Sequence, residues 1–264
     1  MDRVSLFARE ASAFQAAARE AAKSGSAPPV PSCPGWSMSD LVLHLGAVQR
    51  GVDVIIRDRL VGFPDRSALA AAELPPDTAG WPLSSGQGPS LGPIPESLLD
   101  WFAEGAARLE TRFRDHAPDA PVWTWSEEQT VGFWVRMQTI EAAVHRWDAE
   151  NALGAASPIP GELAVDAVAQ TFQVMAPVRR AWQQAPAGAG ERYLFRRTDG
   201  PELWTVRFDG EHVRLSGGDD FDVELAGTAS DLMLFLWQRI PADALDVQGD
   251  KSLLDRYFVL VPPI

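Results

Sequence analysis

The sequence is poor in cysteine and histidine, and it has no long apolar run. Cys33 is the only cysteine among the 264 residues, and there are only four histidines. No disulfide can form within the chain, which fits an intracellular location. The amino-terminal residues lack the apolar core of a signal peptide, and no run approaches the roughly 18 consecutive apolar residues of a membrane span. We expect a cytoplasmic protein that has no membrane partner.

Positive charge is also scarce. The chain has 23 Lys and Arg residues against 36 Asp and Glu residues, which gives a net charge of -13. A surface with this charge repels nucleic acid and anionic lipid, so neither is expected as a partner. An anionic substrate requires that arginines or a metal make one pocket locally positive. Apolar residues make up 46% of the chain, which is enough for one large domain or two modest ones.

Apolar residues recur at spacings of three and four through most of the first half of the chain, which is typical of amphipathic helices. The pattern predicts four helices, at about residues 2–23, 37–55, 96–116 and 131–152. Ser37, with Asp40 three residues later, has the pattern of a capping box at the start of the second helix. Residues 75–95 are rich in Pro, Gly and Ser and should form a long loop. Four helices with one long connection predict a bundle.

The pattern changes after residues 157–161, where Ser-Pro-Ile-Pro-Gly is the best candidate for a domain boundary. The turn dipeptides Asp199-Gly200 and Asp209-Gly210 then separate short segments that are typical of strands. The strands are predicted at 193–197, 203–208 and 212–215, with a further candidate at 223–226, and helices at about 163–178, 230–239 and 250–257. We therefore predict an α+β protein of two domains: a four-helix bundle at residues 1–156, and a small α+β domain with an antiparallel sheet at residues 161–264.

Two of the four histidines have unusual positions. Glu141 and His145 are four residues apart on the fourth predicted helix, so they lie on one face. This face is mostly apolar, and an inward carboxylate and imidazole must be paired, hydrogen-bonded or bound to a metal. His44 has a similar inward position on the second predicted helix. Two histidines and one glutamate suit Zn²⁺ and leave one coordination position open, although manganese, iron and nickel also accept these ligands.

A purely structural interpretation of these residues is also open, because a buried histidine is often a satisfied core residue. Asp148 or Gln138 could orient an imidazole from outside the ligand set, as metal-bound histidines usually require. Asp148 could equally pair with Arg146 on the surface. Cys33 precedes a Pro-Gly turn at a helix start and could be a nucleophile or a fourth ligand, but we favour a packing role for it.

Four stretches of the sequence resemble the mycothiol-dependent maleylpyruvate isomerase family. Residues 33–45 (CPGWSMSDLVLHL) resemble the first motif of that family, and residues 141–150 (EAAVHRWDAE) resemble its second motif. Residues 223–232 and 246–250 resemble parts of its carboxy-terminal domain, which is similar to sterol carrier proteins. The resemblance therefore touches both halves of the chain, although it is concentrated in these short stretches.

The resemblance implies a DinB-like fold for the amino-terminal bundle and a bound divalent metal, with zinc as the first choice. The metal ligands of the family are a histidine in the first motif and a glutamate and a histidine in the second, which fall on His44, Glu141 and His145. The resemblance also implies mycothiol, the low-molecular-weight thiol of actinobacteria, as thiol cofactor or co-substrate. One position departs from the family, because Ile140 stands where many members have a histidine.

The activity implied by the resemblance is isomerisation of a small molecule, a maleylpyruvate-like cis-enedioate, through addition of a thiolate to its double bond. Transfer of the same thiolate to an electrophile would make the protein an S-transferase. Two other functions fit the residues: a hydrolase that uses metal-bound water, and a non-catalytic carrier of a small ligand with a structural metal. Six arginines could bind a substrate carboxylate through paired hydrogen bonds: Arg136, Arg179, Arg180, Arg196, Arg197 and Arg207.

Overall fold

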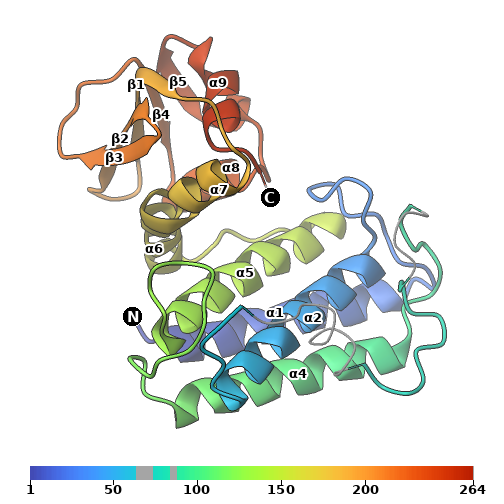
Figure 1. The fold of residues 1–264 in the computed structure, drawn as a ribbon. Helices are drawn as coiled ribbons and strands as arrows, with labels where there is room; N and C mark the ends of the chain where they lie inside the picture. The colour runs from blue at the N-terminus through green and yellow to red at the C-terminus, as the bar shows by residue number, and fades with distance from the viewer. Residues whose placement is uncertain (64–73, 84–87, 264) are drawn as a thin grey trace. The chain divides into compact units, whose positions relative to one another are not determined.

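The computed structural model describes residues 1–63, 74–83 and 88–263 (Figure 1). The predicted loop at 75–95 falls within these ranges except for residues 84–87, and its described part contains no helix or strand before Pro95. The chain divides into two compact units, Met1–Ser157 and Pro158–Ile264. None of the described helices combines the length and the apolar character that are needed to cross a bilayer.

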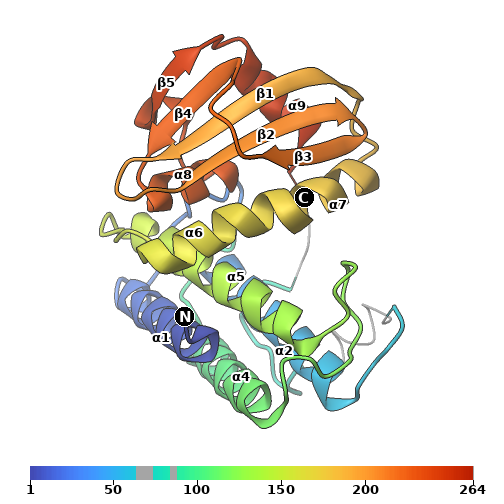
Figure 2. The same cartoon turned by 90° about the vertical axis from the view of Figure 1, so that its left-hand side faces the viewer.

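The described residues of the first unit form four long helices, as predicted. These are α1 (Arg3–Ala22), α2 (Met38–Arg57), α4 (Glu96–Asp115) and α5 (Val131–Ala152). Helices α1 and α2 each pack along both α4 and α5, so the four share one core (Figures 1 and 2). The largest side chains buried there include Phe7, Phe14, Leu41, Leu45 and Phe102. The sequence pattern predicted these helices because an amphipathic helix buries its apolar stripe.

The start of α2 is fixed by the predicted capping box. The backbone N–H of Asp40 donates to the Ser37 hydroxyl oxygen (3.4 Å), and the backbone N–H of Ser37 donates to the Asp40 carboxylate (2.8 Å). Both groups would otherwise be unpaired at the helix end. The cap therefore determines where α2 begins, and it sets His44 about two turns into the helix.

A tight turn precedes this cap. The backbone N–H of Val30 donates to the carbonyl of Trp36 (2.8 Å), and the N–H of Trp36 donates to the carbonyl of Cys33 (3.0 Å). Gly35 has a φ of 86°, a left-handed conformation that glycine adopts without steric cost. The turn is thus closed by its own backbone, and it positions Ser32 and Cys33 just before α2.

The second unit contains one five-stranded sheet. Its strands are β1 (Gly188–Arg197), β2 (Leu203–Gly210), β3 (His212–Ser216), β4 (Val223–Gly227) and β5 (Asp246–Gly249). The order across the sheet is β3-β2-β1-β4-β5, as Figure 2 shows. The sheet is mostly antiparallel, as predicted, but β1 and β4 are parallel.

The parallel pairing follows from the connection between β3 and β4. These strands both run in the direction of β1, so residues 217–222 must cross from one end of the sheet to the other over β2 and β1. The Thr205 hydroxyl donates to the carbonyl of Gly218, and Arg192 pairs with Asp222 at 2.6 Å. These contacts hold the crossing segment against the sheet. Strand β5 has only four residues and only a weak alternation of apolar and polar side chains, so the periodicity of the sequence did not predict it.

Helices cover one face of this sheet. Helix α6 (Gly161–Gln170), a π-helical turn η1 (Thr171–Met175) and α7 (Ala176–Trp182) follow one another without a break, and α8 (Ala229–Leu236), the 3-10 turn η2 (Ala242–Ala244) and α9 (Leu253–Leu260) come later in the chain. The core between helices and sheet is aromatic. The Tyr257 ring of α9 packs against Tyr193 and Phe195 of β1, and Phe172 of η1 packs against Phe195 at 5.0 Å.

A buried ion pair joins α1 to α5. The Nε of Arg146 donates to the Glu10 carboxylate at 3.0 Å, and each side chain is only 4% exposed. The Nη1 of Arg146 also donates to Glu150 (2.8 Å) and to the hydroxyl of Ser157 (2.8 Å). The guanidinium is therefore buried inside the first unit and paired through its Nε and Nη1.

Replacing Arg146 by methionine should lower the free energy of unfolding of this unit by about 3 kcal/mol, because the Glu10 carboxylate stays buried without its main partner. Replacing Arg146 by methionine and Glu10 by leucine together should cost much less, because that charge is removed as well. Urea unfolding followed by tryptophan fluorescence measures both. A double variant that is as unstable as the single one would contradict this assignment.

Candidate metal centre

The structure brings His44, Glu141 and His145 together. Each offers one ligand atom, and the three atoms all lie within 4.8 Å of one another. The Nε2 of His145 is 3.2 Å from the Glu141 carboxylate, and the rings of His44 and His145 meet edge to face with centroids 5.1 Å apart. Ligand atoms around a four-coordinate zinc are about 3.3 Å apart, given bond lengths near 2 Å. Small side-chain movements therefore suffice for a common metal.

Two helices supply these three side chains. Glu141 and His145 are one turn apart on α5, and His44 reaches them from α2. The His145 side chain is 5% exposed, whereas that of Glu141 is 18% exposed. Trp36, from the turn before α2, packs edge-on against His44 with ring centroids 4.8 Å apart. The ligand set is thus buried at His145 and more open at Glu141, where a further ligand could approach.

Asp148 contacts the other nitrogen of the His145 ring. Its Oδ2 is 2.9 Å from His145 Nδ1, and the side chain is completely buried. A carboxylate at Nδ1 keeps the proton on that nitrogen and leaves Nε2 for a metal. The alternative in which Asp148 pairs with Arg146 on the surface is wrong, because both side chains are buried. Arg146 pairs with Glu10 and Glu150.

Gln138 lies one turn before Glu141 on α5 and is 1% exposed. Its carbonyl oxygen has no hydrogen-bond partner among the described residues. A buried amide oxygen in this state calls for a water, an ion or a ligand as its partner. The suggestion that Gln138 orients an imidazole stays a prediction.

The charges around His145 suit a cation. Burial of the ring disfavours its charged form, but hydrogen bonds to Asp148 and Glu141 outweigh that effect, and together they raise the pKa of His145 to about 9. Without a metal, the imidazole therefore carries a second proton between two carboxylates at neutral pH. A divalent cation can replace the charge of that proton, and two imidazole nitrogens and a carboxylate oxygen are ligands that zinc prefers. The residues present fit a metal site.

Two contacts at the site were not predicted. The Ser32 hydroxyl donates to Oδ1 of Asp148 (2.6 Å), and the Cys33 thiol donates to Oδ2 of the same carboxylate (3.4 Å). Cys33, His145 and Asp148 consequently form a second group of potential ligand atoms within 4.8 Å of one another. Ser32 precedes the first motif by one residue, and nothing in its local sequence indicates a distant carboxylate as its partner.

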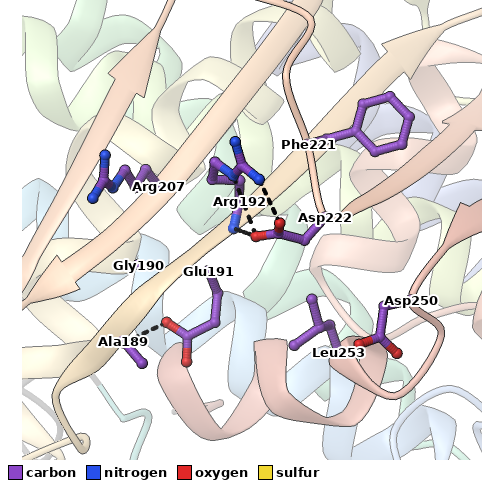
Figure 3. A pocket seen from close by; sticks show the side chains of 9 residues that line it. All are labelled: Ala189, Gly190, Glu191, Arg192, Arg207, Phe221, Asp222, Asp250 and Leu253. Carbon is purple, nitrogen blue, oxygen red and sulfur yellow. Dashed lines mark hydrogen bonds and ion pairs between the residues drawn. The ribbon is translucent and has the colours of Figure 1, made fainter.

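The second unit carries a separate surface hollow of about 790 Å³. Figure 3 shows it beside β1, with Arg192 turned toward Asp222. Arg192 pairs with Asp222 and Asp220, and Glu191 pairs with Arg256 at 3.0 Å. The hydrogen bond from Arg192 also holds the pKa of Asp222 below its ordinary value. The charged groups of the hollow thus largely neutralise one another, and it lacks the histidines of the first unit.

The structure also narrows the choice among the six arginines. Arg180 is buried and donates to the backbone carbonyls of Leu260 and Gly210. Arg196 pairs with Glu224, and Arg197 is held by Asp199 and Glu202. These three arginines have structural contacts, and the guanidinium of Arg179 also lies over the Trp237 ring, 5.8 Å from its centroid. A role for any of the six in binding a substrate carboxylate stays a prediction.

Comparison with known families agrees with both units. Residues 7–150 match the mycothiol maleylpyruvate isomerase N-terminal domain, and residues 162–256 match the MDMPI C-terminal domain. The chain belongs to the mycothiol maleylpyruvate isomerase family. This membership assigns the chain to a family of enzymes.

Two solved structures share the fold of this family member over nearly its whole length. One is the crystal structure of the mycothiol-dependent maleylpyruvate isomerase, with 16% sequence identity and a TM-score of 0.60. The other is a histidine-to-alanine mutant of a protein with that name, with 17% identity and a TM-score of 0.59. Each comparison covers 94% of this chain and 93% of the other. A search of curated proteins finds no match.

Binding of Zn²⁺ at pH 7 should release about one proton, because a metal at Nε2 displaces the second proton of His145, whose pKa is raised to about 9. The apparent affinity should therefore rise as the pH increases toward 9 and fall at lower pH. Calorimetry in two buffers with different ionisation enthalpies counts the protons. Equal binding enthalpies in both buffers would show that no proton leaves and would contradict the prediction.

Proposed function

We propose that this family member is a metal-dependent enzyme that uses mycothiol as its thiol. Its reaction would be isomerisation of a maleylpyruvate-like cis-enedioate or transfer of the thiol to an electrophile. The observation that carries the proposal is the convergence of His44, Glu141 and His145 within 4.8 Å, in a partly open site. Zinc is the metal that the nitrogen and carboxylate donors favour.

The three ligands would leave one position open. A divalent metal held by them would supply a Lewis acid that binds a thiol sulfur as thiolate at neutral pH. Within the protein, Asp148 keeps the proton of His145 on Nδ1 and thereby directs Nε2 toward Glu141. The ring of Trp36 packs against His44 and restricts its rotation. These contacts prepare the ligand geometry, which limits reorganisation on metal binding.

The thiol would supply a reversible nucleophile. Its sulfur would add to one carbon of the cis double bond, and the neighbouring carbonyl would accept the electron pair of that bond. Rotation about the resulting single bond and loss of the same thiolate would then restore the double bond in the trans form. An S-transferase would share the addition and keep the carbon–sulfur bond, so the ligand set supports both reactions equally.

The alternative functions have weaker support. A hydrolase using metal-bound water needs the same ligands and differs only in requiring no thiol. A carrier of apolar ligands would need an apolar cavity in the second unit. The hollow described above gives such a role no support, because most of its lining residues are charged, including Glu191, Arg192 and Asp222. The lone thiol of the chain and the lack of a membrane-spanning helix among the described residues agree with the cytoplasmic location that we propose.

Turnover of a maleylpyruvate-like substrate should require both metal and added thiol. His145→Ala should abolish metal binding and turnover, because it removes a ligand. Cys33→Ser should retain most turnover, because the nucleophile comes from outside the chain and a hydroxyl can replace the thiol as a hydrogen-bond donor. Metal analysis and product assays with and without mycothiol measure these effects.

The outcomes of this experiment separate the candidate functions. A wild-type protein that is fully active without thiol would favour the hydrolase. Loss of turnover in Cys33→Ser, with metal content and folding unchanged, would instead place Cys33 among the reacting groups. Retained activity in a metal-free His145→Ala protein would refute the proposed metal chemistry.

A further inference from the structure

Asp148 is a fully buried carboxylate that is held from three sides. Both of its oxygens accept hydrogen bonds: Oδ1 from the Ser32 hydroxyl at 2.6 Å, and Oδ2 from the Cys33 thiol at 3.4 Å and from His145 Nδ1 at 2.9 Å. Leaving such a group without donors is costly in a protein interior. Two of these donors, Ser32 and Cys33, belong to one short turn, so this turn helps to determine how the carboxylate lies.

The turn is rigid enough for that task. Its ends are joined by the hydrogen bond from Val30 N to the Trp36 carbonyl, and the N–H of Cys33 donates back to the carbonyl of Val30 (3.0 Å). The isolated bridge between Pro29 and Ser37 ties it to the start of α2. The donors of Ser32 and Cys33 are therefore fixed by backbone contacts that do not involve Asp148.

We infer that Ser32 and Cys33 are positioning residues for the metal ligand His145. They hold the Asp148 carboxylate in the orientation in which it accepts the Nδ1 proton of His145, so that Nε2 faces Glu141 and His44. The inference rests on the proposed metal site. It goes beyond the ligand set because it assigns a role to the thiol of Cys33 that is neither nucleophilic nor ligating: the sulfur acts as a neutral S–H donor.

If Cys33 acts as a hydrogen-bond donor, serine and alanine at position 33 should have different effects on the site. Serine keeps a donor where the thiol stood, whereas alanine removes it and leaves one lone pair of Asp148 without its partner. A packing role for Cys33 would show the reverse order, because alanine fits a small apolar space better than a hydroxyl does. At position 32, threonine keeps the hydroxyl and alanine removes it.

The test is a titration of the purified full-length protein with Co²⁺, a spectroscopic substitute for zinc. Ser32→Ala and Cys33→Ala should each bind Co²⁺ about five- to tenfold more weakly than the wild type, the size expected for loss of the net contribution of one ordinary hydrogen bond. Their visible absorption bands should also change, because the orientation of the His145 ring is less restricted. Ser32→Thr and Cys33→Ser should restore both the affinity and the spectrum.

Ser26→Ala is the matched control. Ser26 is exposed, lies in the preceding turn and is not one of the donors to Asp148, so its substitution should leave Co²⁺ binding unchanged. Circular dichroism and the melting temperature of each variant identify general loss of structure. As a second measurement, ¹⁵N chemical shifts of the His145 ring in the Zn²⁺-bound protein report whether Nδ1 still carries the proton.

This experiment distinguishes a failure of the proposed metal site from a failure of the proposed positioning role. If the wild type binds neither Co²⁺ nor Zn²⁺, the proposed metal site is wrong. If it binds them, and folded Ser32→Ala and Cys33→Ala variants match Ser26→Ala in affinity, spectrum and ring shifts, the positioning role is wrong while the metal site stands. A sulfur-to-cobalt charge-transfer band that disappears in both Cys33→Ala and Cys33→Ser would also overturn the inference, because the thiol would then be a direct ligand.

Discussion

The interior of the helical bundle is organised around the hydrogen bond between Asp148 and His145. Asp148 has no exposed surface, and a carboxylate in that position is tolerated only when donors or cations surround it. The imidazole meets this requirement and is oriented by the same contact. Stability and ligand placement therefore depend on one interaction. The chain cannot relax the geometry of the site without leaving a buried charge unsatisfied.

Much of this arrangement could be predicted because helical periodicity is a local property. The spacing of Glu141 and His145 places them on one face of α5, and the capping pattern at Ser37 sets the position of His44 along α2. That these two faces meet does not follow from either spacing. The family motifs supplied that step, since they associate the three residues with one metal.

The remaining features depend on contacts between distant parts of the chain. Arg146 and Asp148 are two residues apart, so the sequence also allowed an ion pair between them. In the structure, Arg146 pairs instead with Glu10 of α1, which is distant in the sequence. The donors on Asp148 come from a turn whose composition is that of an ordinary loop. The segment 223–227 resembles a strand, but its parallel pairing with β1 is set by the crossing segment 217–222. Local sequence carries little information about such choices.

The separation of the site residues along the chain also bears on how the protein would acquire the proposed metal. Ser32 and Asp148 are 116 residues apart in the sequence. Along the chain, α4 separates α2 and α5, the two helices that carry the ligands. In the unfolded chain, a metal on Glu141 and His145 would have to close a long loop to reach His44, at an entropic cost that grows with the logarithm of the loop length. In the folded bundle, packing of the four helices already holds the ligands close together, so the metal does not have to close this loop. Unlike a zinc finger, whose folding is driven by its ion, this bundle would fold first and bind the proposed metal afterwards. Metal supply would then limit the proposed activity rather than the amount of folded protein.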